Sequence, residues 1–189
     1  MIFRPITLIG LLIAVAAPAI SQTQDDEAEK VFRAVHTETA PVIDGVLDEN
    51  VWSLADAVED FHEIQPNEYD EPSQRTQVFV LYDEDYLYVA AKLWDTEPNG
   101  VTAQILRQGS GINNDDYFGV ILDPFHDRRS GYRFQVNPNG VREEAIYQNT
   151  TQTQNDWQGI WRGEASIVED GWTLEMAIPY KTLSFNPAN

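Results

Sequence analysis

Two tryptophans close together in the segment NDWQGIW, Trp157 and Trp161, are the first residues that could do chemistry. They lie four residues apart, and this spacing puts two side chains on one face of either a helix or a strand. Two such rings could stack on the apolar C–H face of a sugar, and the neighbouring Asp156 and Gln158 could bind its hydroxyl groups. The alternative is that one or both rings anchor a core. Our hypothesis is that Trp157 contacts a ligand while Trp161 packs.

Three aspartates at the ends of predicted strands could hold a metal ion. Asp115, Asp116 and Asp123 would supply the hard oxygen ligands that calcium prefers. The sequence contains no cysteine, so no disulfide can hold the fold, which rests on its core, on bound ions or on both. Any calcium would therefore be structural, and the alternative is that these carboxylates are solvated strand ends of an acidic protein.

Patterns typical of catalysis are weak in this sequence. The three histidines, His36, His62 and His126, are far apart and form no HExxH pair. There is no GxSxG segment and no glycine-rich phosphate loop. The adjacent acids at 115–116 and 143–144 would face opposite sides of a strand, so neither pair makes a two-carboxylate site. We therefore expect no catalytic residues in this chain.

The chain is strongly acidic. It has 189 residues and a formal net charge of −19 at pH 7, from 12 Lys and Arg against 31 Asp and Glu. This charge repels phosphate backbones and anionic lipid head groups, so nucleic acid is not an expected partner. A neutral ligand or a divalent cation suits it better.

The N-terminus reads as an export signal. Residues 1–21 combine a basic start, an apolar run too short to span a membrane, and small side chains near the end, which predicts a signal peptide. Residues 22–30 are polar and are expected to form a disordered lead-in. The remaining residues, 31–189, are enough for one domain with its own core.

These candidate residues must be positioned by strands, because the dominant hydrophobic period after residue 30 is two. The turns NPNG and EDG are the most specific hairpin signals, since Gly140 and Gly171 tolerate positive φ. Eight short strands at hairpin spacing predict an all-β fold, an antiparallel β-sandwich. The predicted strands cover residues 31–36, 76–82, 87–94, 117–123, 132–137, 141–147, 163–168 and 172–178.

One short helix is expected from Asp48 to Asp56, with Asp48 as its N-cap. Trp52 would share its apolar face with Val51 and Leu54. We expect this tryptophan to pack under an edge of the sandwich, the alternative being a platform for a ligand.

The opening of the family 9 carbohydrate-binding modules resembles three segments of this chain in the same order: PVIDGVLDENVW, TQVFVLYDEDYLYVAAKLWD and NDDYFGVILDP. The resemblance covers residue 40 to about residue 183. It implies a β-sandwich in which Trp52 belongs to an entry motif that serves the fold. It also implies further strands beyond residue 189, so that the domain would be incomplete at its C-terminus.

Family members that bind sugar hold a terminal sugar unit between tryptophan rings, with charged and amide side chains on its hydroxyls. The resemblance puts Asn113 and Asn114 where one ring would be expected, and Gln135 where an arginine would be expected. The chain therefore departs from the family's pattern at both positions. The candidate carbohydrate-binding residues are Trp157, Asn113, Asn114, Gln135, Asp156 and Gln158.

The resemblance implies non-catalytic carbohydrate binding by a module of a larger exported protein, with any glycosidase activity in a partner domain. The later segments GYRFQVNPNGV, NDWQGIW and GWTLEMAIPYKTLSF are similar to bacterial proteins in which such a domain precedes a C-terminal outer-membrane β-barrel. The expected location is the periplasm, the outer membrane or the cell surface. The alternative is an accessory domain of such a barrel protein that binds protein or lipid instead of sugar.

Overall fold

The computed structural model describes residues 31–149 and 152–184. The predicted signal peptide, residues 1–21, and the predicted lead-in, residues 22–30, lie outside these residues. All of the described residues except Val31 belong to one compact unit, which begins at Phe32. Within the described residues, no helix has the length and apolar character needed to cross a membrane.

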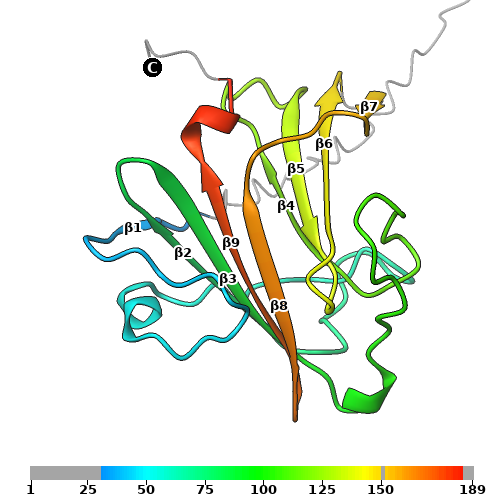
Figure 1. Cartoon of the computed structure of the whole chain (residues 1–189). Coiled ribbons are helices and arrows are strands. Elements are labelled where there is room, and N and C mark those ends of the chain that lie inside the picture. The colour runs from blue at the N-terminus through cyan, green and yellow to red at the C-terminus, as the bar shows by residue number, and fades with distance from the viewer. Residues whose placement is uncertain (1–30, 150–151, 185–189) are drawn as a thin grey trace, which may run out of the picture. The chain divides into compact units, whose positions relative to one another are not determined.

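The strands of this unit form two sheets (Figure 1). The five-stranded sheet has the order β1 (Val35–His36), β2 (Thr76–Tyr82), β3 (Tyr86–Trp94), β9 (Gly171–Pro179) and β8 (Arg162–Val168). The four-stranded sheet has the order β4 (Phe118–Leu122), β5 (Gly131–Val136), β6 (Arg142–Gln148) and β7 (Gln152–Gln154). All neighbouring strands are antiparallel except β1, which runs parallel to β2. The predicted β-sandwich is confirmed, with mixed pairing at one edge.

Two strand predictions needed correction. The strand expected at 31–36 is limited to Val35–His36, because Val58 already pairs with β2 at Val78 and takes up the rest of that edge. Strand β7 was not among the predicted strands. Its three residues are all exposed and polar, so no apolar alternation in the sequence indicates a strand.

The predicted helix is shorter than expected. It is the 3-10 helix η1 (Asn50–Leu54), and its N-cap residue is Glu49, which makes no capping hydrogen bond with its side chain. The prediction of Asp48 as N-cap is therefore wrong. The Glu49 carboxylate instead accepts a hydrogen bond from the backbone N–H of Val42, at 3.0 Å, and ties the preceding segment to the helix. Two further 3-10 helices are η2 (Pro98–Gly100) and η3 (Tyr180–Thr182).

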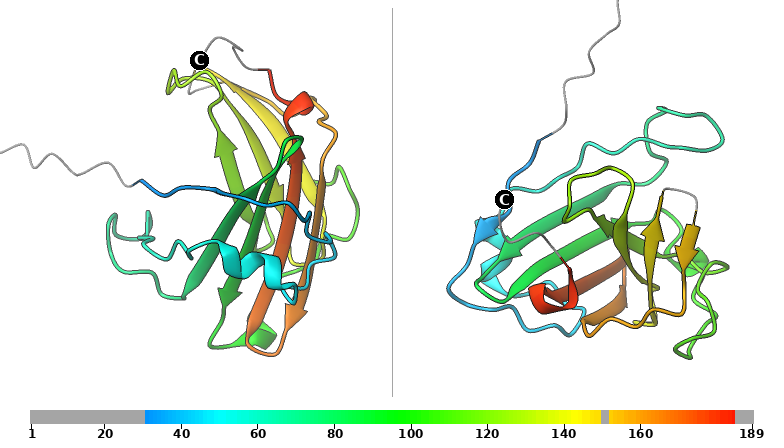
Figure 2. Two further views of the ribbon diagram at one scale, coloured as in Figure 1. Left: turned by 90° about the vertical axis from the view of Figure 1, so that its left-hand side faces the viewer. Right: turned by 90° about the horizontal axis from the view of Figure 1, so that it is seen from above.

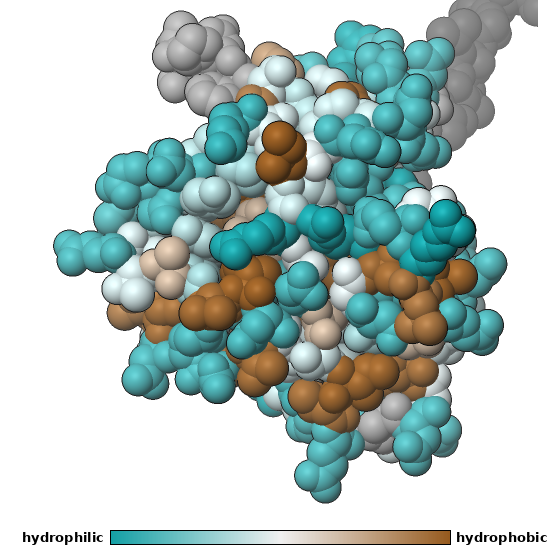
Figure 3. All heavy atoms as spheres, in the orientation of Figure 1, coloured by the Kyte–Doolittle hydropathy of each residue, from teal (hydrophilic) through white to brown (hydrophobic). Residues whose placement is uncertain are grey.

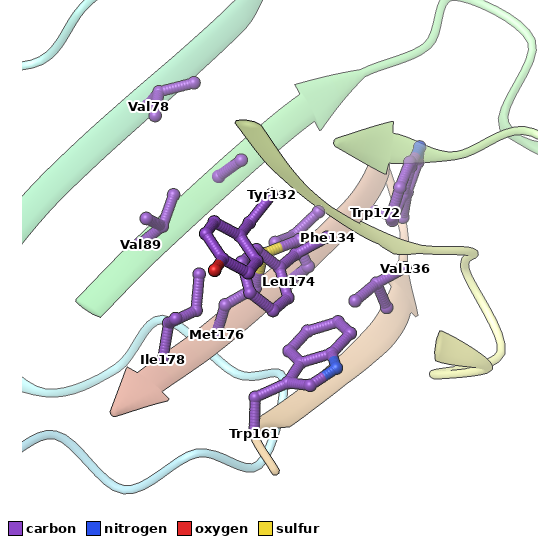
Figure 4. Close-up of a cluster of buried hydrophobic side chains, with 11 residues drawn as sticks. Val78, Val89, Tyr132, Phe134, Val136, Trp161, Trp172, Leu174, Met176 and Ile178 are labelled. Atoms are coloured by element: carbon purple, nitrogen blue, oxygen red, sulfur yellow. The ribbon is translucent and has the colours of Figure 1, made fainter. Parts of the chain in front are cut away.

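The main hydrophobic core lies between the two sheets. In Figure 4 side chains of β5, such as Phe134, point toward those of β9, such as Leu174 and Met176. Trp161 precedes β8 and is 4% exposed, and its ring packs edge-on against Phe134 with 5.1 Å between the ring centroids. The expectation that Trp161 packs in the core is confirmed.

A second core covers the outer face of the five-stranded sheet. The chain from Ile43 to Ala55, which includes η1, crosses that face (Figure 2, left), and Trp52 lies beneath it at 4% exposure. Its indole N–H donates to Oε1 of the fully buried Glu175, at 2.8 Å. The expectation that Trp52 packs and serves the fold is confirmed, but it lies over the face of the sheet and not under an edge of the sandwich.

Glu175 anchors the chain from Ile43 to Ala55, which we call the covering segment. Its Oε2 accepts hydrogen bonds from the backbone N–H groups of Asp44 and Gly45, each at 3.0 Å. Gly45 has a φ of +85°, and a Cβ added there would lie 2.7 Å from the backbone of Ala165, so only glycine fits. The IDG motif and Trp52 are thus joined through a single buried carboxylate on β9.

The surface apolar residues are divided by polar ones. On the face seen in Figure 3, hydrophobic residues gather mainly in the lower half, in patches separated by hydrophilic side chains. Exposed apolar side chains scattered in this way are normal for a soluble domain. On this face the apolar residues therefore do not by themselves mark a functional site.

Candidate functional site

The register of β4, β5 and β6 places several polar side chains on the outer face of the four-stranded sheet. Tyr132, Phe134 and Val136 of β5 point into the core, so the alternating Arg133 and Gln135 point outward. Gly131 lies on the same face of β5 as Arg133 and Gln135. Residues paired directly across two strands also share a face, so the partners of these three residues in β4 and β6 lie on the outer face too. These partners are Gly119 and Ile121 of β4, and Glu143, Ala145 and Tyr147 of β6.

Four of these residues form a connected group, which we call the Arg133 cluster: Arg133, Gln135, Glu143 and Tyr147. The Arg133 guanidinium donates to Glu143 Oε1 at 3.0 Å and to the Tyr147 hydroxyl at 3.5 Å. It also lies over the Tyr147 ring, 5.8 Å from the centroid. Both members of the ion pair are largely buried, with 16% and 21% of their side chains exposed. The cluster is therefore a partly buried polar group on the outer face, held by an ion pair.

Two atoms of the cluster are buried and have no hydrogen-bond partner among the described residues. They are the Nε–H donor of Arg133 and the Oε1 acceptor of Gln135. Gln135 is only 6% exposed, and its side chain crosses Gly119, where an added Cβ would lie 2.8 Å from Gln135 Cγ. Leaving a buried polar atom without a hydrogen-bond partner costs about 1–3 kcal/mol of folding free energy. A hydrogen bond from a ligand to either atom would recover part of this cost.

A pocket of about 390 Å³ adjoins the cluster at Tyr147 and Ile121. Its far wall is the turn after β4, where Asp127 accepts hydrogen bonds from the backbone of Arg129 and from both the backbone and the side chain of Ser130. The hydrogen bond from the Ser130 hydroxyl is the main reason that the pKa of Asp127 is lowered. The remaining lining residues are Asp123, Arg128, Arg129, Ser130 and Gly131.

The segment before β4 is fastened at the other end of the cluster. The backbone N–H of Ile112 donates to Glu143 Oε2 at 3.1 Å, and Ile112 is 1% exposed. Asp115 receives hydrogen bonds from the backbone N–H groups of Gln104 and Ile105 and from the Asn137 amide, at 2.8–3.0 Å. Burial alone would raise the pKa of Asp115, but these hydrogen bonds together outweigh it and lower the pKa.

We expect Asp115→Asn to lower the free energy of unfolding by about 1–3 kcal/mol at pH 7, because an amide NH2 would face N–H donors. The folded-state pKa of Asp115 is lowered, so its contribution is present above the ordinary carboxyl value of 3.8 and is lost as pH falls through the folded value. The difference in the free energy of unfolding between wild type and Asp115→Asn should therefore become smaller below pH 3.8. Urea midpoints at pH 7 and pH 3 measure it, and equal midpoints at pH 7 would refute the anchoring role.

The structure divides the predicted carbohydrate-binding residues. Gln135 lies on the outer face, and the exposed Asn113 and Asn114 follow Ile112, whose N–H is bonded to Glu143 beside Gln135. These three are therefore brought to one face. Asp156 and Gln158 are exposed on the connection from β7 to β8, next to Asn155, whose side chain approaches Arg133 at 3.4 Å.

Trp157 lies on the other side of the sheet. It is half-buried, and its ring packs against Tyr132 and Phe134 of the inner face, with centroid distances of 5.1 and 6.0 Å. Its six-membered ring also lies over Gly159, where an added Cβ would come within 2.8 Å of Cη2. The sheet itself separates Trp157 from Gln135, so these two residues do not form one site.

The three predicted calcium ligands are not brought together. Among the described residues, no group of three His, Cys, Asp or Glu side chains could hold a metal ion. Asp115 is bonded as described above, Asp116 accepts from the Thr102 N–H, and Asp123 accepts from the N–H groups of Phe125 and Arg128. Each carboxylate is engaged in its own loop, and structural calcium stays a prediction from the sequence.

Three members of the cluster, Arg133, Glu143 and Tyr147, were not among the residues predicted to bind carbohydrate. The signal was available, because Arg133 and Gln135 alternate with the apolar residues of GYRFQV and must share the outward face. The cross-strand register that adds Glu143 and Tyr147 is set by the NPNG turn, where Gly140 has a φ of +74°. That register could not be read from β6 alone.

A family model described as "Carbohydrate family 9 binding domain-like" matches residues 43–189. A carbohydrate-binding module of family 9 from Caldicellulosiruptor kristjanssonii, in complex with glucose, is 19% identical over 83% of this chain and 72% of that chain, with a TM-score of 0.53. A family 9 module from the same organism in complex with cellotriose is 20% identical over 83% and 71%, with a TM-score of 0.50.

A third solved structure, of a protein from Bacteroides uniformis described as a candidate carbohydrate-binding protein, is 14% identical over 81% of this chain and 75% of that chain, with a TM-score of 0.59. At these identities the likeness establishes the fold. No curated protein matches the chain.

Proposed function

Because the chain belongs to the carbohydrate family 9 binding domain-like family, we propose that it is a non-catalytic module that binds carbohydrate. We place the ligand on the outer face of the four-stranded sheet, over the Arg133 cluster and the adjoining pocket. The observation that carries this location is the pair of unpartnered atoms, Arg133 Nε and Gln135 Oε1.

The chemistry of these two atoms fits a hydroxyl group. A hydroxyl both donates and accepts, so one sugar hydroxyl can donate to Gln135 Oε1 while another, or the same one, accepts from Arg133 Nε–H. Both atoms are covered by neighbouring side chains, which a ligand would have to displace. Each hydrogen bond formed there replaces no existing one, so its gain is not offset by a lost partner.

The adjoining pocket supplies apolar surface. Tyr147 offers an aromatic ring and Ile121, which is 61% exposed, an aliphatic side chain. The C–H face of a sugar ring needs such surface next to polar groups, and a volume of about 390 Å³ is within the usual range for small-ligand sites. Two of the structural neighbours hold glucose and cellotriose, which supports a neutral sugar as the ligand.

Calorimetric titration of the mature protein with glucose and cellotriose tests this function. We expect saturable binding by wild type. For Tyr147→Ala we expect a dissociation constant about tenfold larger, corresponding to ~1.4 kcal/mol. Tyr82→Ala is the matched control, because Tyr82 is an exposed aromatic of the other sheet. Absence of binding to these two sugars and to a panel of soluble polysaccharides would contradict the function. Equal affinities of wild type and Tyr147→Ala would contradict only the location.

We further propose that the module is exported, on the support of the signal-like residues 1–21. Expression in a Gram-negative host should give a product whose N-terminus is Gln22 after cleavage. N-terminal sequencing of the protein from the periplasmic fraction measures this. An intact product retained in the cytoplasm would contradict the proposal.

A further inference from the structure

A second and larger groove lies on the outer face of the five-stranded sheet, beside η1, and is lined by residues of η1, β2 and β3 among others. Its volume is about 710 Å³, which is within the range of ligand sites in proteins. It is separate from the Arg133 cluster, which lies on the outer face of the other sheet. Its lining includes the apolar Phe79 and the aromatic Trp94, together with the polar Gln77, Lys92 and Asp170.

Trp94 is held firmly in this groove. Its backbone N–H donates to the Arg75 carbonyl at 2.9 Å, and the Arg75 guanidinium lies over its ring, 4.4 Å from the centroid. The Lys92 ammonium lies 5.4 Å from the same centroid and pairs with Asp170. Cations at these distances are attracted to the indole ring, so the tryptophan is fixed before any ligand arrives.

The charges of the groove disfavour an anionic ligand. The lining carries three acids, Asp48, Glu49 and Asp170, against one cation, Lys92, which is paired with Asp170. At the Trp94 ring, Arg75 and Lys92 already take the positions that a cationic ligand would need. A neutral ligand with many hydrogen-bonding groups meets neither obstacle.

The polar lining matches hydroxyl groups. Glu49 lines the groove, and its Oε2 is buried without a hydrogen-bond partner among the described residues, which leaves an acceptor available. Gln77, Asn50 and Ser53 also line the groove and carry polar side chains. Hydroxyl donors on one edge of a sugar could meet these groups while its C–H face contacts Trp94 and Phe79.

We propose that this groove is a second carbohydrate-binding site, with Trp94 as its aromatic platform. The choice of ligand class rests on the proposed function of the module, whereas the location rests on the groove alone. The two sites lie on opposite outer faces of the sandwich. One molecule can therefore hold two sugar chains, or two parts of one flexible chain, and gains avidity without a new contact.

The test is a calorimetric titration of the mature protein with cellotriose and with soluble polysaccharides, read for the number of sites as well as for affinity. Wild type should bind at two sites. Trp94→Ala should lose one of them, and the milder Gln77→Ala should weaken that site by about tenfold, corresponding to ~1.4 kcal/mol. Tyr82→Ala, an aromatic deletion on the same sheet outside the groove, should change neither site.

The outcomes separate this inference from the proposed function. If Tyr147→Ala weakens all of the binding and Trp94→Ala and Gln77→Ala weaken none, the groove proposal is overturned and the Arg133 cluster stands. If the reverse holds, the groove is the site and the cluster is not. If wild type binds none of these sugars, both are overturned. An NMR titration of the Trp94 indole N–H, assigned by its loss in Trp94→Phe, gives a readout that does not depend on variant stability.

Discussion

Replacing Trp161 by alanine is expected to lower the free energy of unfolding by about 3–5 kcal/mol, the usual cost of truncating a core aromatic. Trp161 is 4% exposed, and its ring contacts Phe134 across the space between the sheets. Its indole N–H donates to Glu144 Oε2 at 3.0 Å, and the Arg142 guanidinium lies over the ring and donates to the Trp161 carbonyl. The substitution therefore removes packing and leaves a carboxylate without its donor.

Urea unfolding followed by circular dichroism measures this effect, and Trp157→Ala is the matched control. Trp157 contacts the same core but is half-buried, so its truncation should cost less. A loss below about 1 kcal/mol for Trp161→Ala would contradict its place in the core. Equal losses for both variants would show that Trp157 belongs to the core to the same degree.

Replacing Glu175 by alanine is expected to cost about 3 kcal/mol or more, because three N–H donors, two of them buried, lose their common acceptor at about 1–3 kcal/mol each. The donors are the backbone N–H groups of Asp44 and Gly45 and the indole of Trp52. The expected consequence is release of the covering segment from the sheet. Loss of hydrogen-exchange protection at Asp44 and Gly45 would accompany the change in unfolding free energy. Glu169→Ala, an exposed acid in the turn before β9, should stay within about 0.5 kcal/mol of wild type.

Glu175 also gives the protein a distinctive pH dependence. Burial raises the pKa of this carboxyl above its ordinary 4.5, although the three hydrogen bonds act in the opposite direction. A raised folded-state value means that its contribution to stability is fully present below the ordinary pKa and is lost as pH rises through the folded value. Relative to Glu175→Gln, which does not titrate, wild type should therefore be more favoured at pH 4 than at pH 8. A difference that is constant between these pH values, or larger at pH 8, would contradict the raised pKa.

Much of the fold could be predicted because its strands alternate in hydrophobicity. Strands β2 and β5 have one face in the core, and the turns after β5 and β8 need glycine with positive φ, so these elements are visible in the residues themselves. Strand β7 is polar and exposed throughout, and it exists because β6 offers a free edge. Such a strand has no local signal.

The candidate site was only partly predictable, because alternation shows the direction of a side chain only where the residue lies in a strand. Gln135 could be placed because its strand and its direction follow from alternation. Trp157 could not, because the connection from β7 to β8 passes between the two sheets and turns its ring toward the inner face. Glu175 is the acidic residue of β9, whose nine residues are all buried, and nothing in the sequence near it indicates what its carboxylate binds. Its meaning appears only with its long-range donors, which lie about 120–130 residues earlier.

The most direct test of the central claim is the affinity of Gln135→Met for cellotriose, measured by calorimetry beside the free energy of unfolding. Methionine keeps the length of the side chain but removes the buried, unpartnered oxygen, so stability should be unchanged or higher by about 1 kcal/mol. If a sugar hydroxyl donates to that oxygen, binding at the outer face of the four-stranded sheet should weaken about tenfold, corresponding to ~1.4 kcal/mol. An unchanged affinity at that site, in a variant that folds as well as wild type, would contradict the account.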